Sequence, residues 1–128
     1  FAWRVLALSE KELGNTDAAV KAIDESIEIH ESGQYLEDAA YDWYIKASIF
    51  SRTEQYPEAL DALEHSLVFD RRAENAAGLG RDWMAIGAVR EKSGDLTGAR
   101  AAWIQARDIF RAAFLTVPAE EAETRLTR

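Results

Sequence analysis

The sequence predicts an all-α fold in which antiparallel helix pairs stack into one solenoid. Tryptophan recurs every 40 residues without a gap, at Trp3, Trp43 and Trp83. A fixed period of this length is typical of repeated supersecondary units. Apolar residues recur at three- and four-residue steps, which is the pattern of amphipathic helices. No segment sustains the alternation of apolar and polar residues that a half-buried strand requires. The chain is therefore expected to be helical throughout.

Residues at fixed distances after each tryptophan also agree among the three copies. Alanine or serine lies 16, 19 and 23 positions later, and a bulky residue lies 20 positions later. Small residues let helix backbones approach closely, and bulky ones fill the space between helix pairs. We therefore predict a repeated structural core made of these residues: Trp3, Trp43, Trp83, Ala19, Ala59, Ala99, Ile23, Leu63 and Trp103.

The first two helix pairs have recognisable ends. A helix is expected over residues 1–13, followed by a left-handed stop signal at 14–15. Thr16 or Asp17 is expected to cap the next helix, which ends at 32–33. The second pair follows, and Pro57 suits the first turn of its second helix because proline lacks the N–H that is unpaired there.

The third pair and the end of the chain carry different signals. Gly78 and Gly80 are expected to loosen the junction before a helix that starts at about residue 80. Pro118 is expected to break the pattern, after which residues 119–128 start another helix without the tryptophan. That helix is either a solvating cap or a truncated fourth repeat. The expected units of this single 1–128 domain cover about 1–33, 36–75, 80–116 and 119–128.

These residues resemble the tetratricopeptide repeat, a helix–turn–helix module. The third unit fits best and the second departs at Lys46, where an apolar residue is usual. The 40-residue period is similar to the longer repeats of LGN-type and kinesin light chain proteins. The resemblance implies a right-handed α-solenoid of three such repeats plus the C-terminal helix. The best-fitting residues are Trp83, Ile86, Gly87, Ala99, Trp103 and Ala106.

Composition excludes several classes of protein. The formal net charge of −8 argues against general affinity for nucleic acid phosphates. There is no cysteine, so disulfides and zinc–sulfur sites are excluded and the compartment stays undetermined. No apolar run reaches the roughly 20 residues needed to insert across a membrane. Because the chain begins with Phe1 inside a repeat, we expect it to be part of a longer protein.

Catalytic, metal and cofactor sites are not predicted. His30 and His65 occupy different repeat positions and have no partner at metal-ligand spacing, so both are interpreted as surface or half-buried helix residues. Asp42 and Asp82 precede their tryptophans and are interpreted as charges that favour the start of a helix. The glycines near residue 80 lack the lysine and serine or threonine of a phosphate-binding loop. The sequence thus does not predict an enzyme.

The resemblance implies that the first helix of each pair lines a concave groove. Five of the matching side chains are basic and two, Glu12 and Glu91, are acidic, whereas the second helices are rich in acids. Leu8, Ile45 and Ala85 stand where a clamp for a C-terminal carboxylate would need other residues, so that clamp is not predicted. The candidate groove residues are Phe1, Arg4, Leu8, Lys11, Tyr41, Tyr44, Ser48, Arg52, Arg81, Met84, Ala88 and Lys92.

The leading hypothesis is a protein-interaction scaffold that binds an extended or helical peptide, with acidic character, in the groove. Tyr41, Tyr44 and Met84 would contact the peptide, and the groove arginines would steer its acidic groups. An interpretation of equal weight is that these charges form a solvated face and that the tyrosines are partly core. The alternative functions are self-association, giving a homo-oligomer, and a regulatory domain of a larger protein.

Overall fold

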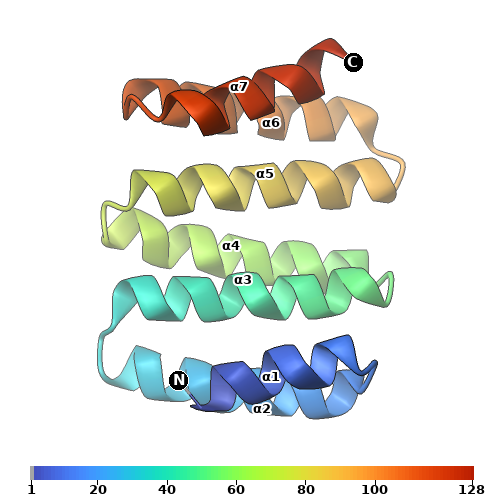
Figure 1. Ribbon diagram of the computed structural model, residues 1–128, viewed down its shortest axis with the longest axis vertical. Helices are drawn as coiled ribbons and strands as arrows, with labels where there is room; N and C mark the ends of the chain where they lie inside the picture. The colour runs from blue at the N-terminus through green and yellow to red at the C-terminus, as the bar shows by residue number, and fades with distance from the viewer. Residues whose placement is uncertain (1) are drawn as a thin grey trace.

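A computed structural model describes residues 2–128, so the predicted groove residue Phe1 lies outside the described residues. Within this range the chain forms seven α-helices and no strand (Figure 1). The all-helical prediction is therefore confirmed. The helices are α1 (Ala2–Glu12), α2 (Thr16–Ser32), α3 (Leu36–Arg52), α4 (Tyr56–Arg72), α5 (Ala76–Lys92), α6 (Leu96–Ala112) and α7 (Thr116–Thr127).

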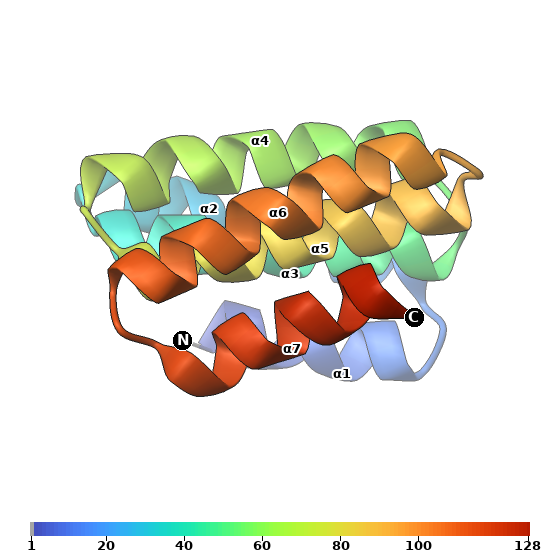
Figure 2. The ribbon, with the colours of Figure 1, turned by 90° about the horizontal axis from the view of Figure 1, so that it is seen from above.

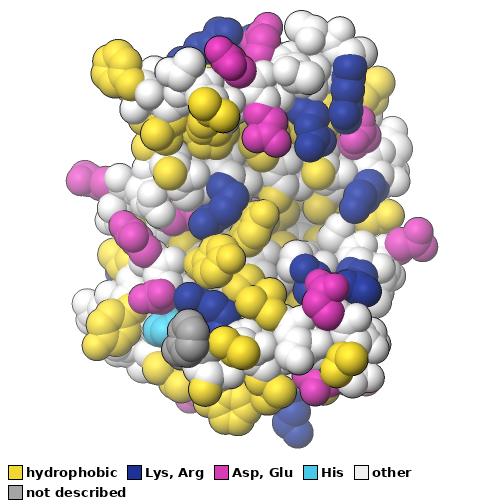
Figure 3. Space-filling view, in the orientation of Figure 1, with side chains coloured by type: hydrophobic (Ala, Val, Ile, Leu, Met, Phe, Trp, Pro, Cys, Tyr) yellow, Lys and Arg dark blue, Asp and Glu magenta, His cyan; other side chains and the backbone are white. Residues whose placement is uncertain are grey.

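The helices form two layers. Helices α1, α3, α5 and α7 make one layer, and α2, α4 and α6 make the other (Figures 1 and 2). In Figure 2, α1 and α7 lie farther from the second layer than α3 and α5 do. The first layer therefore curves around a concave face, which is turned toward the viewer in Figures 1 and 3. This arrangement is the predicted solenoid of helix pairs.

The helices recur at a strict spacing, which is half the 40-residue period of the helix pairs. Helices α2 to α6 each have 17 residues, and helix starts from α2 to α7 are 20 residues apart. Each turn contains one residue with positive φ, between 53° and 91°. The next N–H donates to the carbonyl five residues earlier, at 2.8–2.9 Å, which satisfies an otherwise unpaired helix end. The positive-φ residues are Gly14, Gln34, Glu54, Glu74, Gly94 and Phe114.

Several predicted helix ends were wrong. Asn15, not Thr16 or Asp17, occupies the cap position of α2 and makes no side-chain capping bond. Helix α6 ends at Ala112, and Pro118 lies in the first turn of α7 rather than breaking the pattern. Proline is tolerated there because the first N–H groups of a helix have no partner within the helix. The predicted place of Pro57, in the first turn of α4, is confirmed.

The glycines near residue 80 do not loosen a junction. Both lie inside α5, which begins at Ala76 and is capped by Asn75. A Cβ added to Gly80 would lie 2.2 Å from the Phe110 ring, and one added to Gly78 would lie 2.4 Å from an Asp70 carboxyl oxygen. These glycines are present because α5 packs closely against its neighbours.

The predicted core residues differ in burial. The predicted core residues on α2, α4 and α6 are at most 1% exposed, whereas Trp3 is 42% exposed. The core assignment of Trp3 was therefore wrong. Trp43 packs between two helix pairs and donates its indole N–H to Glu31 of α2, at 2.7 Å. The corresponding face of Trp3 has no such neighbour within residues 2–128. The buried set is Ala19, Ala59, Ala99, Ile23, Leu63 and Trp103.

Candidate peptide-binding groove

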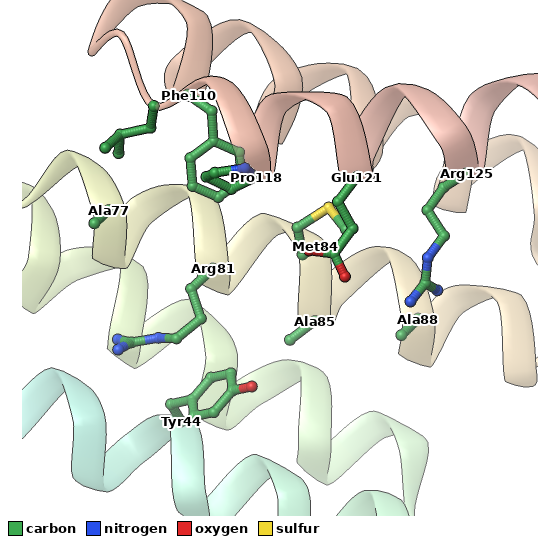
Figure 4. A pocket seen from close by; sticks show the side chains of 11 residues that line it. Tyr44, Ala77, Arg81, Met84, Ala85, Ala88, Phe110, Pro118, Glu121 and Arg125 are labelled. Carbon is green, nitrogen blue, oxygen red and sulfur yellow. The ribbon is translucent and has the colours of Figure 1, made fainter.

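The concave face contains a cavity of about 520 Å³ between α5 and α7, beside α3 (Figure 4). Small side chains on α5 leave this space open, and Tyr44, Met84 and Phe110 give it apolar walls. Arg81, Glu121 and Arg125 add charged groups at the sides. The full lining is Tyr44, Ala77, Arg81, Met84, Ala85, Ala88, Phe110, Leu115, Pro118, Glu121 and Arg125.

A smaller cavity of about 180 Å³ lies between α3 and α5. Tyr44, Ala85 and Ala88 line both cavities, so the two are neighbours on one face. We call this pair of cavities the groove. Figure 3 shows hydrophobic side chains along the middle of the concave face, with basic side chains beside them. The smaller cavity is lined by Tyr44, Ala47, Ser48, Ser51, Leu63, Ala85, Ala88 and Val89.

The structure brings together only part of the predicted groove set. Tyr44, Ser48, Arg81, Met84 and Ala88 line the two cavities. The remaining described candidates lie outside both. Among these, Arg52 and Lys92 are exposed at the C-terminal ends of α3 and α5. The candidates outside the cavities are Arg4, Leu8, Lys11, Tyr41, Arg52 and Lys92.

The predicted steering arginines are already paired with acids. Arg4 donates from Nε to Asp42 at 2.8 Å and lies 3.2 Å from Asp38. Arg52 lies 3.3 Å from Glu12, across the ends of α3 and α1. Arg81 likewise contacts two buried carboxyl groups of its own neighbourhood. These ion pairs reduce the positive charge that the three arginines can offer to a ligand.

Tyr41 and Tyr44 stack on each other and on two arginines at the concave face. The rings of Tyr41 and Tyr44 are nearly parallel, with centroids 5.9 Å apart. The Arg81 guanidinium lies 4.8 Å from the Tyr44 centroid, and the Arg4 guanidinium lies 4.9 Å from that of Tyr41. Burial, more than any neighbouring charge, raises the pKa of Tyr44. Its hydroxyl therefore stays protonated at neutral pH and can donate a hydrogen bond to a ligand.

Sequence reasoning missed the contribution of α6 and α7 to the groove. Phe110, Leu115, Pro118, Glu121 and Arg125 all line the larger cavity. One signal was present, because Glu121 stands 40 residues after Arg81. Continuing the period into the helix that lacks tryptophan would have included it.

The two aspartates before the tryptophans also differ from their prediction. Asp42 and Asp82 are fully buried in the second turn of their helices, so they do not act as solvated charges at helix starts. His30, predicted as surface or half-buried, is half-buried and contacts Asp42. The sequence pattern could not reveal this burial, because aspartate at the same position of an isolated helix would face water.

Among residues 2–128, no three histidine, aspartate or glutamate side chains gather to hold a metal ion. None of the helices in this part of the chain combines the length and apolarity needed to span a bilayer.

Comparison with known proteins gives a structural match. The structure is similar to the N-terminal domain of stress-induced protein-1 (STI-1) from C. elegans, a domain with tetratricopeptide repeats. The TM-score is 0.74 and the identity 18%, over 95% of this chain and 92% of the other. The chain has the tetratricopeptide-repeat fold. Neither a protein-family model nor a curated protein matches the sequence.

The match confirms the predicted fold and the resemblance on which it was based. At 18% identity the likeness concerns the fold alone, and no ligand can be transferred from it.

Proposed function

We propose that the domain binds a peptide segment of a partner protein in the groove. The observation that carries this proposal is the cavity of about 520 Å³, lined from α3, α5 and α7 together. Ligand pockets are commonly concave and mostly apolar, with a few polar groups that fix orientation. A large aliphatic or aromatic side chain of the peptide would enter between Tyr44, Met84 and Phe110.

The charges beside the cavity favour an acidic residue next to that anchor. Among the ion pairs of residues 2–128, none involves Arg125 or Lys92. Arg125 lines the cavity, so a carboxylate of the peptide can pair with it there. Glu121 lies one turn earlier on the same helix and would repel a carboxylate placed beside it. The peptide acid would therefore lie toward the C-terminal end of α7.

A pair of matched variants tests the proposal. Ala88 lines both cavities, so Ala88→Phe fills them, whereas Ala101→Phe adds the same ring to an exposed position on α6. Peptides selected from a random library on the wild-type domain serve as the probe. We expect Ala88→Phe to weaken their binding at least tenfold and Ala101→Phe to leave it unchanged, at equal thermal stability. Equal binding by all three proteins would contradict the proposal.

Self-association is a second candidate, supported by the surface of α1. Trp3, Val5 and Leu6 of α1 are between 42% and 49% exposed. A second copy of the chain can cover such side chains in a symmetric dimer. Sedimentation of wild type and a Leu6→Lys variant tests this candidate. A monomeric wild type at high concentration would rule it out.

A further inference from the structure

Where one helix pair packs on the next, the contact contains residues from the same three positions of the 40-residue repeat. We call these contacts the first junction (α2 with α3), the second junction (α4 with α5) and the third junction (α6 with α7). Two of the positions are on the second helix and one is on the helix that follows. Their residues are Ser26, His30 and Asp42 in the first junction, Ser66, Asp70 and Asp82 in the second, and Ala106, Phe110 and Ala122 in the third.

The first and third junctions are chemically complete. Asp42 accepts hydrogen bonds from Arg4 Nε at 2.8 Å, from Ser26 Oγ at 2.9 Å and from His30 Nδ1 at 2.5 Å. A buried carboxylate is stable when a cation and several donors surround it. The third junction is apolar, with Phe110 packed among alanines. Neither junction needs anything further to be satisfied.

The second junction has one carboxyl group too many. Asp70 stands at the repeat position that His30 occupies in the first junction. Two carboxyl groups, those of Asp70 and Asp82, are therefore fully buried at the second junction. Arg81 is the cation that pairs with them, with Nη2 at 3.2 Å from Asp70 Oδ2 and 3.6 Å from Asp82 Oδ1. Asp70 also accepts from Asn75 Nδ2 at 3.1 Å. Two ionised carboxylates would thus bury one uncompensated negative charge.

Hydrogen-bond counting gives the same result. Ser66 Oγ lies 2.8 Å from both the Ala40 carbonyl oxygen and Asp82 Oδ1, yet a hydroxyl has only one hydrogen. Among residues 2–128, the buried Asp82 Oδ2 meets no donor, and the buried Nε–H of Arg81 meets no acceptor. A proton on Asp82 supplies one more donor, because the carboxyl group can then donate either to Ser66 or to Asp70. Asp70 already accepts hydrogen bonds from two donors, Arg81 and Asn75.

We propose that the second junction is a proton-dependent joint: one proton held between Asp70 and Asp82 keeps the second and third helix pairs together, and its loss opens their contact. Burial raises the pKa of Asp82 to about 9, assisted by the hydrogen bond and the charge of Asp70. Arg81 from α5 and Tyr44 from α3 also face the pair, and the Arg81 guanidinium lies over the Tyr41 ring.

The sign of the pH dependence follows from this raised pKa. The closed joint holds a proton that a solvated Asp82, with its ordinary pKa near 4, would release. Stability is therefore complete below that ordinary pKa, falls as the pH rises, and reaches its lowest level above about pH 9. One proton released per opening event means that the opening equilibrium constant rises about tenfold per pH unit within this window.

The joint lies beside the groove. Tyr44 on one side of it and Arg81 and Met84 on the other line the larger cavity together. Opening of the joint would separate α3 from α5 and alter that cavity. The joint itself does not depend on peptide binding, so it can be tested without any ligand.

Two isosteric substitutions have opposite expected effects. In Asp82→Asn the amide N–H₂ replaces the proton as donor, and the charge is removed. We expect this variant to be more stable than wild type at pH 8.5. Asp42→Asn places an amide among three donors at the first junction, so we expect its unfolding equilibrium constant to rise at least tenfold over wild type.

Urea unfolding is measured at pH 7.5 and at pH 8.5, which both lie inside this window. Between these pH values, the unfolding constant of wild type should rise about tenfold, and that of Asp82→Asn should stay constant. Native-state hydrogen exchange on wild type, corrected for intrinsic rates, should show protection falling tenfold in α4 and α5. Asp82→Asn less stable than wild type at pH 8.5, or equal pH dependence in both proteins, would overturn the proposal. If Asp82→Asn does not fold, wild-type hydrogen-exchange protection that stays the same between pH 7.5 and 8.5 would overturn the proposal.

Discussion

Gly80→Ala is the substitution for which ordinary helix propensity and this structure predict opposite signs. In an exposed helix interior, replacing glycine with alanine stabilises by about 1 kcal/mol. At Gly80 the new Cβ would lie 2.2–2.7 Å from three atoms of the Phe110 ring, which is itself only 5% exposed. Relieving such overpacking costs about 1–3 kcal/mol. Subtracting the propensity gain of about 1 kcal/mol leaves an expected net destabilisation of up to about 2 kcal/mol.

A double-mutant cycle isolates this contact. In a Phe110→Ala background the ring is absent, so Gly80→Ala should recover its propensity gain and stabilise by about 0.5–1 kcal/mol. Chemical denaturation of the four proteins at one pH measures all the terms. If Gly80→Ala stabilised the wild-type domain, or behaved the same in both backgrounds, the close approach of α5 to α6 would not be what requires glycine.

Three further substitutions test other parts of the account by chemical denaturation. Trp103→Ala should lower the free energy of unfolding by about 3–5 kcal/mol, because the Trp103 side chain is only 1% exposed. Trp3 is 42% exposed, so Trp3→Ala should lower it far less. Equal losses in the two variants would contradict this difference in burial. Arg81→Met removes the cation beside two buried carboxyl groups and should lower the free energy of unfolding by about 3 kcal/mol at pH 7. An unchanged stability would mean that these ion pairs contribute nothing. Glu74→Gly, at φ 53°, should stabilise by about 1 kcal/mol, since glycine adopts this conformation without strain; a loss would show that the turn is not strained.

Much of the fold could be predicted because the residues that recur in the sequence are those that form the core. Trp43, Ala59 and Leu63 recur at fixed spacing because each helix pair buries the same face. The turns could not be predicted as well. At Gly14 the glycine itself indicates a left-handed backbone conformation. The equivalent residue of the next pair is Glu54, whose type gives no such indication, and its positive φ is imposed by the helices on either side.

The groove could be predicted only in part, for two physical reasons. Fold resemblance indicates which helices line the concave face, but cavities form where small side chains such as Ala85 meet a neighbouring helix. The charge on Arg4 and Arg81 was read from sequence without their buried partners. Asp42 comes from the next helix pair, so its contact with Arg4 exists only after the pairs have stacked.

The central claim is that the groove binds peptide, and amide chemical-shift mapping tests it most directly. A library-selected peptide is titrated into labelled domain. We expect the largest shifts on α3, α5 and α7 around Tyr44, Met84 and Arg125, and we expect them to disappear in Ala88→Phe. Shifts confined to the outer layer of α2, α4 and α6, unaffected by Ala88→Phe, would contradict it.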